Sequence, residues 1–341
     1  MLEPLVSVLI PCYNCESYII DCINSVIEQS YQNIEILVCD DGSTDDSYNK
    51  VIKLAQTDKR IKVFKNEVNS GKVKTINRLI LESKGHYISF LDSDDFVTQH
   101  KIKLQVNFML DNPDHSLCGT AFARVNTEGD VFDEIILPRT DSEIRNEILS
   151  GSGMPVCCGS VLAVGEFVRK VGGYRSYFED CSGEDVDFVA RLLDYGKGTN
   201  LDDVCYFYRY RAFSLTRRVF SSVKQRHSHE IIGFLAKNRW DTNSKVDYLT
   251  SDIEALNDYI ALLAKPYESD PTLIHRQMAF DHALNGSVIP TAKAVVKGLS
   301  IHNIINSVKC VFMVSIILIF PNKLLLLLKT KLGLKNLGKK L

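Results

Sequence analysis

Two carboxylates one residue apart, Asp92 and Asp94, directly follow an apolar run that ends at Leu91. Carboxylates this close repel each other unless a cation lies between them. Mg²⁺ and Mn²⁺ prefer oxygen ligands, and they commonly take one or two carboxylates together with substrate phosphates. The pair therefore predicts a site for a metal–diphosphate. Taken alone, an ordinary solvated turn or helix cap is as good an interpretation.

Two further segments carry groups that suit a nucleotide. Asp41 lies in the run Asp40–Ser43, where a carboxylate can accept hydrogen bonds from a base or a ribose. The alternative for this run is a turn with a helix cap. Lys72 follows Gly71 at the expected start of a helix, where the dipole and the ammonium together suit a phosphate. Taken alone, a solvated surface lysine is the favoured interpretation of Lys72.

A second acidic pair, Glu184 and Asp185, follows Gly183 at the start of another expected helix. Acids in a first turn normally complement the helix dipole. Either one is also placed to act as a general base. Arg209 and Arg211 offer cations for a leaving phosphate, and the alternative for both is surface solubility.

The elements that would position these residues alternate between strand and helix. Apolar runs predict strands at residues 5–10, 34–39, 61–64 and 87–91, and helical spacing predicts helices at residues 17–29, 45–56 and 72–83. Single helices between strands imply a mostly parallel sheet, in which ligands bind outside the carboxyl ends of the strands. Three of those ends carry Pro11–Asn14, Asp40–Ser43 and Asp92–Asp95, so the candidate groups converge on one edge.

After Lys101 the pattern is mixed. We expect helices at residues 102–110 and 184–193, and strands at residues 117–125, 131–137, 159–164 and 204–210. Residues 221–281 have helical patterning, with apolar residues from Tyr248 to Leu263 on one stripe. That stripe fits a core or partner-helix face better than a cofactor site.

Residues 6–14, 39–45, 90–95 and 183–185, in this order and spacing, resemble the family 2 inverting glycosyltransferases over residues 5–218. The resemblance implies a GT-A fold, an α/β fold with a mostly parallel Rossmann-like sheet flanked by helices. It also implies a nucleotide-sugar donor, most often a UDP-sugar, and a divalent metal, Mn²⁺ or Mg²⁺.

The resemblance also implies roles for single residues. Asp185 would be the catalytic base and Asp94 the metal ligand. The nucleotide sugar would contact Pro11, Tyr13, Asn14, Asp41, Lys72, Asp92, Ser93, Arg209 and Arg211. Within that set, Pro11, Tyr13 and Asp41 would lie at the nucleobase, Lys72 near the phosphates, and Asp92 at the ribose and sugar.

Two positions depart from the family's pattern. Many members carry an Arg before the Asn of the third helix, where this chain has Ile76 before Asn77. Many also carry a His in the segment that ends Ser-Leu-Thr, where this chain has Arg211. A guanidinium cannot ligate a metal as a neutral His does. Either the metal has fewer protein ligands here, or Arg211 pairs with the diphosphate directly.

The expected reaction is a direct displacement. Asp185 would take the proton of an acceptor hydroxyl as that oxygen attacks the anomeric carbon. The metal at Asp94 would neutralise the departing diphosphate. Lys72, Arg209 and Arg211 would add positive charge. The expected acceptor is a glycan or lipid-linked precursor.

Three other classes of protein fit less well. A sugar-nucleotide pyrophosphorylase should have a Gly-rich loop with a basic residue where this chain has Pro11–Asn14. A processive polysaccharide synthase should carry Gln-x-x-Arg-Trp and several membrane spans, but Ala236 occupies the Gln position before Arg239-Trp240. A non-catalytic nucleotide-sugar binding module would tend to lose the acids, yet Asp92, Asp94 and Asp185 are all present.

Composition and charge limit the partners. The 341 residues are 45% hydrophobic and 24% charged, which excludes global disorder. Residues 282–341 hold nine Lys and no Arg, Asp or Glu, although the net charge of the chain is −2. This Leu-rich basic tail suits an anionic membrane surface, and no nucleic-acid partner is expected. We expect a transferase domain at residues 1–220, a helical extension at 221–300 and a membrane-associating tail at 301–341.

The sequence of the tail does not have the pattern of a simple membrane span. Its apolar run at residues 311–320 is broken by Pro321-Asn322-Lys323 before residues 324–328. A span needs about 20 consecutive apolar residues. An interfacial helix or hairpin on an anionic leaflet is therefore expected. The alternative is a helix docked on the protein's own core or on a second subunit, which leaves a homo-oligomer open.

The expected location is the cytoplasm, peripheral on the inner face of the membrane. Residues 1–11 lack the basic segment of a signal peptide, so the ten cysteines should stay reduced. Cys12 and Cys15 have the spacing of a zinc or redox pair. They fit small buried residues at a strand end better.

Overall fold

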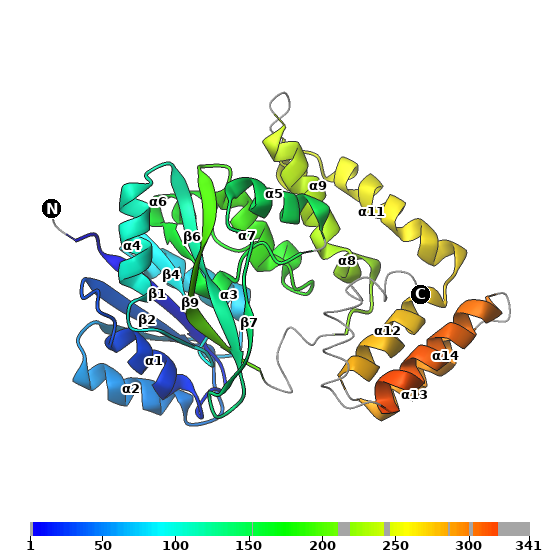
Figure 1. Cartoon of the computed structure of the whole chain (residues 1–341), viewed down its shortest axis with the longest axis horizontal. Helices are drawn as coiled ribbons and strands as arrows, with labels where there is room; N and C mark the ends of the chain where they lie inside the picture. The colour runs from blue at the N-terminus through cyan, green and yellow to red at the C-terminus, as the bar shows by residue number, and fades with distance from the viewer. Residues whose placement is uncertain are drawn as a thin grey trace. The chain divides into compact units, whose positions relative to one another are not determined.

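The computed structural model of the chain describes residues 3–151, 153–210, 219–241, 246–285, 287–299 and 303–319. The chain divides into two compact units, shown in Figure 1. The first consists of residues 1–211 and 232–247, and the second of residues 212–231 and 248–341. The three-part division expected from the sequence stays a prediction.

The elements alternate regularly as far as the fourth strand and are mixed beyond it. The strands are β1 (Val6–Cys12), β2 (Ile34–Asp40), β3 (Ile61–Lys65), β4 (Tyr87–Phe90), β5 (Phe96–Val97), β6 (His115–Val125), β7 (Val131–Ile135), β8 (Leu162–Val164) and β9 (Lys197–Arg209). The helices up to β9 are α1 (Ile19–Ile27), α2 (Ser47–Thr57), α3 (Lys72–Glu82), α4 (Lys101–Asp111), α5 (Asp141–Ser150), α6 (Gly165–Val171) and α7 (Glu184–Leu192), with the 3-10 helices η1 (Cys158–Ser160) and η2 (Ser176–Phe178). The later helices are α8 (Val223–Arg226), α9 (Ser228–Trp240), α10 (Tyr248–Ser251), α11 (Ile253–Ser269), α12 (Leu273–Leu284), α13 (Val288–Gly298) and α14 (Ile304–Ile319).

One sheet forms the centre of the first unit, in the order β3-β2-β1-β4-β8-β6-β9-β5, with β7 paired to β6. The four strands β1 to β4 are all parallel to their neighbours, as predicted. The other half is mixed, because β8 runs antiparallel to both β4 and β6, while β6 and β9 are parallel. The carboxyl ends of β1, β2 and β4 therefore meet at one edge.

The apolar patterning located the first half of the sheet well. Every strand and helix predicted before residue 95 is present, with ends within two residues of the expected ones. The patterning missed α5, which buries only Ile144 and Ile148 and so shows a weak stripe. The capping box of Thr140 and Glu143 was the available signal for this helix. The apolar patterning also placed the start of β9 too late, because the first half of that strand is polar.

The run Asp40–Ser43, for which a helix cap is the alternative interpretation, does not cap α2. Helix α2 has Asp46 as its N-cap, with no capping bond from that side chain. The hydroxyl of Ser43 instead accepts a hydrogen bond from the backbone N–H of Asn14, at 3.0 Å. The side-chain oxygen of Asn14 in turn accepts from the backbone N–H of Thr44, at 2.9 Å. The loops after β1 and β2 are thereby joined.

The second unit contains a small bundle of α12, α13 and α14. Its core consists of the buried residues Ala279, Phe280, Ala283, Ala294, Cys310, Val314 and Ile317. Among the residues that the structure describes, no helix has both the length and the apolarity needed to cross a membrane. The Pro321-Asn322-Lys323 break and the rest of the basic tail lie outside the described residues.

Close packing at Gly85 joins β4 to β1 and yields a stability prediction. The backbone N–H of Gly85 donates to the Ser7 hydroxyl at 2.8 Å, and a Cβ at residue 85 would lie 2.5 Å from the Ser7 nitrogen. Gly85→Ala should therefore lower the free energy of unfolding by about 1–3 kcal/mol through overpacking. Urea denaturation measures this, with the exposed neighbour Lys84→Ala as the control. Equal stability of both variants would contradict the close approach.

Candidate active site

The loop after β4 carries the first acidic pair and is fixed by Asp95. The Asp95 side chain is buried, and its carboxylate accepts hydrogen bonds from the Tyr206 hydroxyl and from the Arg209 backbone N–H, the latter at 2.7 Å. The Asp95 N–H donates to the carbonyl of Asp92 at 3.1 Å. Strand β9 thus holds the loop, while Asp92 and Asp94 are partly exposed.

The electrostatics of Asp95 differ from those of an exposed acid. Burial, followed by the neighbouring Asp94 and Asp92, raises the pKa of Asp95 well above its ordinary value. The hydrogen bonds from Tyr206 and Arg209 lower this pKa but do not offset burial. The third acid of the run, buried and bound to β9 through both carboxylate oxygens, is therefore an anchor for the loop.

Lys72 brings the two acidic pairs together. Its ammonium, at the start of α3, lies 2.7 Å from Oδ1 of Asp92. Burial alone would lower the pKa of Lys72, but Asp92, Glu184 and Asp185 reverse this effect and raise it. The lysine is therefore charged, and the end of β4 and the start of α7 lie at one site.

The start of α3 is built by Asp41. The carboxylate of this buried residue accepts hydrogen bonds from the Asn66 side chain at 2.7 Å and from the backbone N–H groups of Ser70 and Gly71, each at 2.9 Å. Gly71 has φ +91°, and a Cβ there would come within 2.6 Å of Oε1 of Glu179. Asp41 therefore positions Lys72, and the residue before Lys72 must be glycine.

The second acidic pair occupies the first turn of α7. The backbone N–H of Gly183 donates to Glu184 at 3.0 Å, and that of Val186 donates to Oδ1 of Asp185 at 2.8 Å. Burial and then the nearby Asp185 raise the pKa of Glu184. Glu184 therefore gains a proton more readily than an exposed glutamate.

The third acid of α7, Asp187, is an internal anchor that sequence reasoning missed. It is fully buried and pairs with Arg191 at 2.9 Å and with Arg175 at 3.5 Å. Arg191 also donates to the carbonyls of Val171 and Gly173, each at 2.7 Å. The helix that carries Asp185 is thus held by a buried ion pair.

Arg209 is buried, which excludes surface solubility as its role. Its guanidinium donates to the carbonyl of Asp94 at 2.9 Å and to that of Thr127 at 2.6 Å. It lies over the rings of Tyr18 and Phe96, at 4.7 and 5.4 Å from their centroids. Arg209 therefore supports the acidic loop through the backbone of that loop. Arg211, predicted beside it, lies outside the described residues.

The remaining predicted contacts differ in exposure. Pro11 lies within β1, and Tyr13, just after this strand, is 43% exposed. Asn14 has φ +48° and is used in joining the two loops. Ser93 is buried, and its hydroxyl donates to the Cys15 sulfur at 3.1 Å. Tyr13 thus offers an exposed aromatic ring to a ligand.

The Cys12–Cys15 pair has the properties of buried structural residues. Both thiols are free and buried, and burial raises the pKa of Cys12. A reactive redox cysteine has a lowered thiol pKa instead. Within the described ranges, no group of three or more His, Cys, Asp or Glu side chains could hold a metal. Both findings agree with the structural interpretation of these cysteines.

The acidic loop suits a metal that is shared with a ligand. Asp92 and Asp94 supply two carboxylates, and the described residues offer no third ligand of that kind to complete a protein-only site. Mg²⁺ and Mn²⁺ accept such a partial set when phosphates and water supply the rest. The residues present therefore fit a divalent metal bound together with a diphosphate.

Comparison with known proteins places the chain in a family. The family model described as "Glycosyl transferase family 2" matches residues 7–164. "Putative glycosyltransferase EpsE" of Bacillus subtilis is 30% identical over 227 residues, which are 64% of this chain and 77% of that relative. This chain belongs to glycosyl transferase family 2. The resemblance seen in the sequence, and the glycosyltransferase class it implied, are confirmed.

Other relatives match a smaller part of the chain. The Escherichia coli enzyme named "UDP-Glc:alpha-D-GlcNAc-diphosphoundecaprenol beta-1,3-glucosyltransferase WfaP" is 43% identical over 105 residues, 31% of this chain and 41% of that relative. A glycosyltransferase of Haemophilus influenzae is 45% identical over 112 residues, 33% of this chain and 45% of that relative. The chain therefore spans less than half the length of these two relatives.

A solved structure confirms the predicted GT-A fold. The structure of S. aureus TarS residues 1–349 with UDP-GlcNAc matches with a TM-score of 0.55 and 19% identity. The match covers 86% of this chain and 90% of the TarS chain. The shared architecture includes the central sheet flanked by helices, and this chain has the expected helical C-terminal region.

The anchoring role of Asp95 gives a prediction that separates charge from hydrogen bonding. Asp95→Ala leaves the Tyr206 hydroxyl and the Arg209 N–H without their buried acceptor, so unfolding should become easier by about 2–4 kcal/mol. Sugar transfer should fall with it. Asp95→Asn can still accept the Arg209 N–H through its amide oxygen and can donate its NH₂ to the Tyr206 oxygen, so it should restore most of the stability and activity.

Denaturant unfolding and transfer kinetics measure these effects, and the exposed Glu82→Ala is the matched control. If Asp95→Asn were as damaging as Asp95→Ala, hydrogen bonding to β9 would not explain the role of Asp95. A near-normal Asp95→Ala variant would rule out the anchor itself.

Proposed function

We propose that this chain is an inverting glycosyltransferase that moves a sugar from a UDP-sugar to a hydroxyl of a lipid-linked glycan precursor. The observation that carries this proposal is the ion pair of Lys72 with Asp92 beside Glu184 and Asp185. The names of the relatives support the substrate classes, because WfaP is named for UDP-Glc and a diphosphoundecaprenol acceptor and TarS was solved with UDP-GlcNAc.

The donor diphosphate is proposed to bind at the end of β4. Asp92 and Asp94 would hold the divalent metal, which when bound supplies positive charge for the departing diphosphate. The Lys72 ammonium lies within ion-pair distance of Asp92 and adds a second cation there. Arg209 is proposed to act indirectly, by holding the backbone of Asp94 in place. A direct contact of Arg211 with the diphosphate stays a prediction.

The nucleoside is proposed to lie over the loops after β1 and β2. The exposed ring of Tyr13 offers a surface for stacking on the base. Pro11 and Asn14 shape the same loop. Asp41 is proposed to act on this part of the site through the loop that it holds at Ser70 and Gly71.

Asp185 is proposed as the general base. Oδ1 of this carboxylate accepts the N–H of Val186, which orients the group at the start of α7. It would take the acceptor's proton while the acceptor oxygen bonds to the anomeric carbon and the bond from that carbon to the diphosphate breaks. One such displacement inverts the anomeric centre. A carboxylate suffices as a base because proton transfer accompanies bond formation.

Asp185→Asn tests the base. The variant should lose about 10²–10⁴-fold in kcat, the usual contribution of a general base. Its affinity for UDP should stay close to that of the unmodified chain, because the base acts on the acceptor. UDP release measures turnover, and calorimetry measures UDP binding.

The adjacent Glu184→Gln is the matched control for this experiment. Because the pKa of Glu184 is raised, a neutral amide resembles the form that this residue adopts readily, and the loss should be smaller. If Asp185→Asn kept most of its turnover while Glu184→Gln lost it, the base would be Glu184.

Asp94→Ala tests the metal site. Direct Mn²⁺ binding in the presence of UDP, followed by electron paramagnetic resonance, should weaken at least about tenfold, since losing even an outer partner of a metal ligand costs that much. Asp130→Ala, an exposed acid on another loop, should bind Mn²⁺ normally. Full transfer activity in excess chelator would rule out the metal.

A further inference from the structure

Helix α14 is apolar on two opposite faces. One face consists of the buried residues Ser307, Cys310, Val314 and Ile317, of which the last three belong to the core of the small bundle. The other face is open: Ile304, Ile305, Val308 and Phe312 are 62%, 68%, 62% and 65% exposed. A helix that is apolar all round is normally covered all round.

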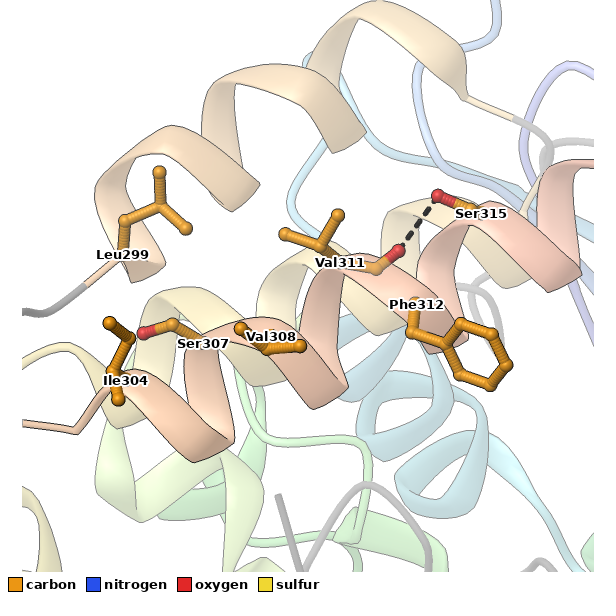
Figure 2. A pocket seen from close by; sticks show the side chains of 7 residues that line it. All are labelled: Leu299, Ile304, Ser307, Val308, Val311, Phe312 and Ser315. Carbon is orange, nitrogen blue, oxygen red and sulfur yellow. Dashed lines mark hydrogen bonds between the residues drawn. The ribbon is translucent and has the colours of Figure 1, made fainter.

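Three of these exposed side chains, Ile304, Val308 and Phe312, line one shallow hollow. Figure 2 shows Leu299, Ile304, Val308, Val311 and Phe312 lining it, together with Ser307 and Ser315. Among the described side chains of α14, Ile305 is the most exposed large apolar residue. We call Leu299, Ile304, Ile305, Val308, Val311 and Phe312 the open face of α14. Monomeric soluble proteins rarely leave such contiguous patches uncovered.

Exposed lysines accompany this open face. Lys309 follows Ile305 by four residues and precedes Phe312 by three, so it lies on the same side of α14. On α13, Lys293 and Lys297 are also exposed, and with Val296 they line a second hollow that includes His275, Met278 and His282 of α12. No Asp or Glu occurs from residue 282 to the last residue. The exposed charges of α13 and α14 are therefore all positive, and Asp270, which accepts a hydrogen bond from Asn303 just before α14, is already paired with Arg276.

This charge pattern selects among the candidates that could cover the face. A second copy related by two-fold symmetry would set the same lysines against one another. Residues 320–341 add six more Lys and no acid, so this segment would also bring like charge. The open face needs a cover for its apolar side chains and a negative charge for its lysines. An anionic bilayer supplies both, because it accepts apolar side chains at its surface and attracts lysines.

We propose that the open face of α14, with Lys293, Lys297 and Lys309, docks on an anionic lipid surface. The 16 residues of α14 span only about 24 Å, which suits a helix lying in the interface. The lysines would reach the lipid headgroups while the apolar side chains enter the acyl boundary. This inference goes beyond sugar transfer and does not depend on the proposed substrates.

Vesicle flotation of the full chain tests the proposal. The unmodified chain should float with vesicles of phosphatidylglycerol and phosphatidylcholine, and much less with phosphatidylcholine alone. The triple variant Ile305→Ser/Val308→Ser/Phe312→Ser should lose at least about tenfold in partitioning. The double variant Val68→Ser/Leu81→Ser is the matched control, because these residues are 70% and 83% exposed in the first unit.

A charge variant tests the lysines separately. Lys293→Gln/Lys297→Gln/Lys309→Gln should weaken binding to anionic vesicles by about fivefold per lysine and reduce its salt dependence. All of these positions are exposed, so thermal melts followed by circular dichroism should match those of the unmodified chain.

The depth to which α14 enters the bilayer can be measured independently of the rest of the tail. In a Trp240→Phe background, which removes the one natural tryptophan, Phe312→Trp should be quenched by brominated lipids in anionic vesicles. Leu81→Trp should not be quenched.

Three results would each overturn the proposal. One is an unmodified chain that stays soluble beside anionic vesicles. Another is a triple variant that partitions normally, which would assign membrane binding to a different segment. The third is a dimer, seen by light scattering, that the triple variant dissociates. UDP release with a water-soluble acceptor should be unchanged in every variant, so failure of docking and failure of the proposed function are distinguishable.

Discussion

The crowding of carboxylates at one sheet edge is the constraint on which this structure depends. Asp92, Glu184 and Asp185 all interact with the ammonium of Lys72. Like charges brought this close in a partly buried site oppose folding unless a cation or a proton compensates. Lys72 supplies the cation, and the raised pKa values of Asp95 and Glu184 favour the protonated form of these two acids. A site built in this way is prepared to accept further positive charge.

The supporting network explains how separate segments are held against that repulsion. Asn77 of α3 exchanges two hydrogen bonds with the backbone of Tyr174, at 2.8 and 2.7 Å. Arg191 of α7 donates to the adjacent Gly173, at 2.7 Å. The helix that carries Lys72 and the helix that carries Asp185 are thus joined through one short loop. The backbone of this loop makes these bonds, and the buried ring of Tyr174 also packs against Phe90 and Phe188.

Sequence reasoning located the charged groups at the sheet edge better than the groups that hold them. Asp92, Lys72 and Asp185 follow strand ends or begin helices, and local patterning predicts such positions. The role of Asp95 depends on Tyr206, which is 111 residues away, and no local pattern links the two. Sequence reasoning offered Arg209 as a phosphate-binding cation or a surface residue, because the rings of Tyr18 and Phe96 that cover it come from other segments. Long-range partners decide such roles, and one sequence does not contain them.

The two proposals together describe how such an enzyme would meet a lipid-linked acceptor. An acceptor confined to a bilayer is dilute in the cell but concentrated at the membrane. A protein that docks on the same bilayer gains that local concentration without new contacts in the active site. The site then needs to recognise only the sugar that carries the attacking hydroxyl. The open face of α14 and its lysines would provide affinity for the surface, and Asp185 would provide the chemistry. Selection could therefore change acceptor specificity at the sheet edge while leaving membrane attachment intact.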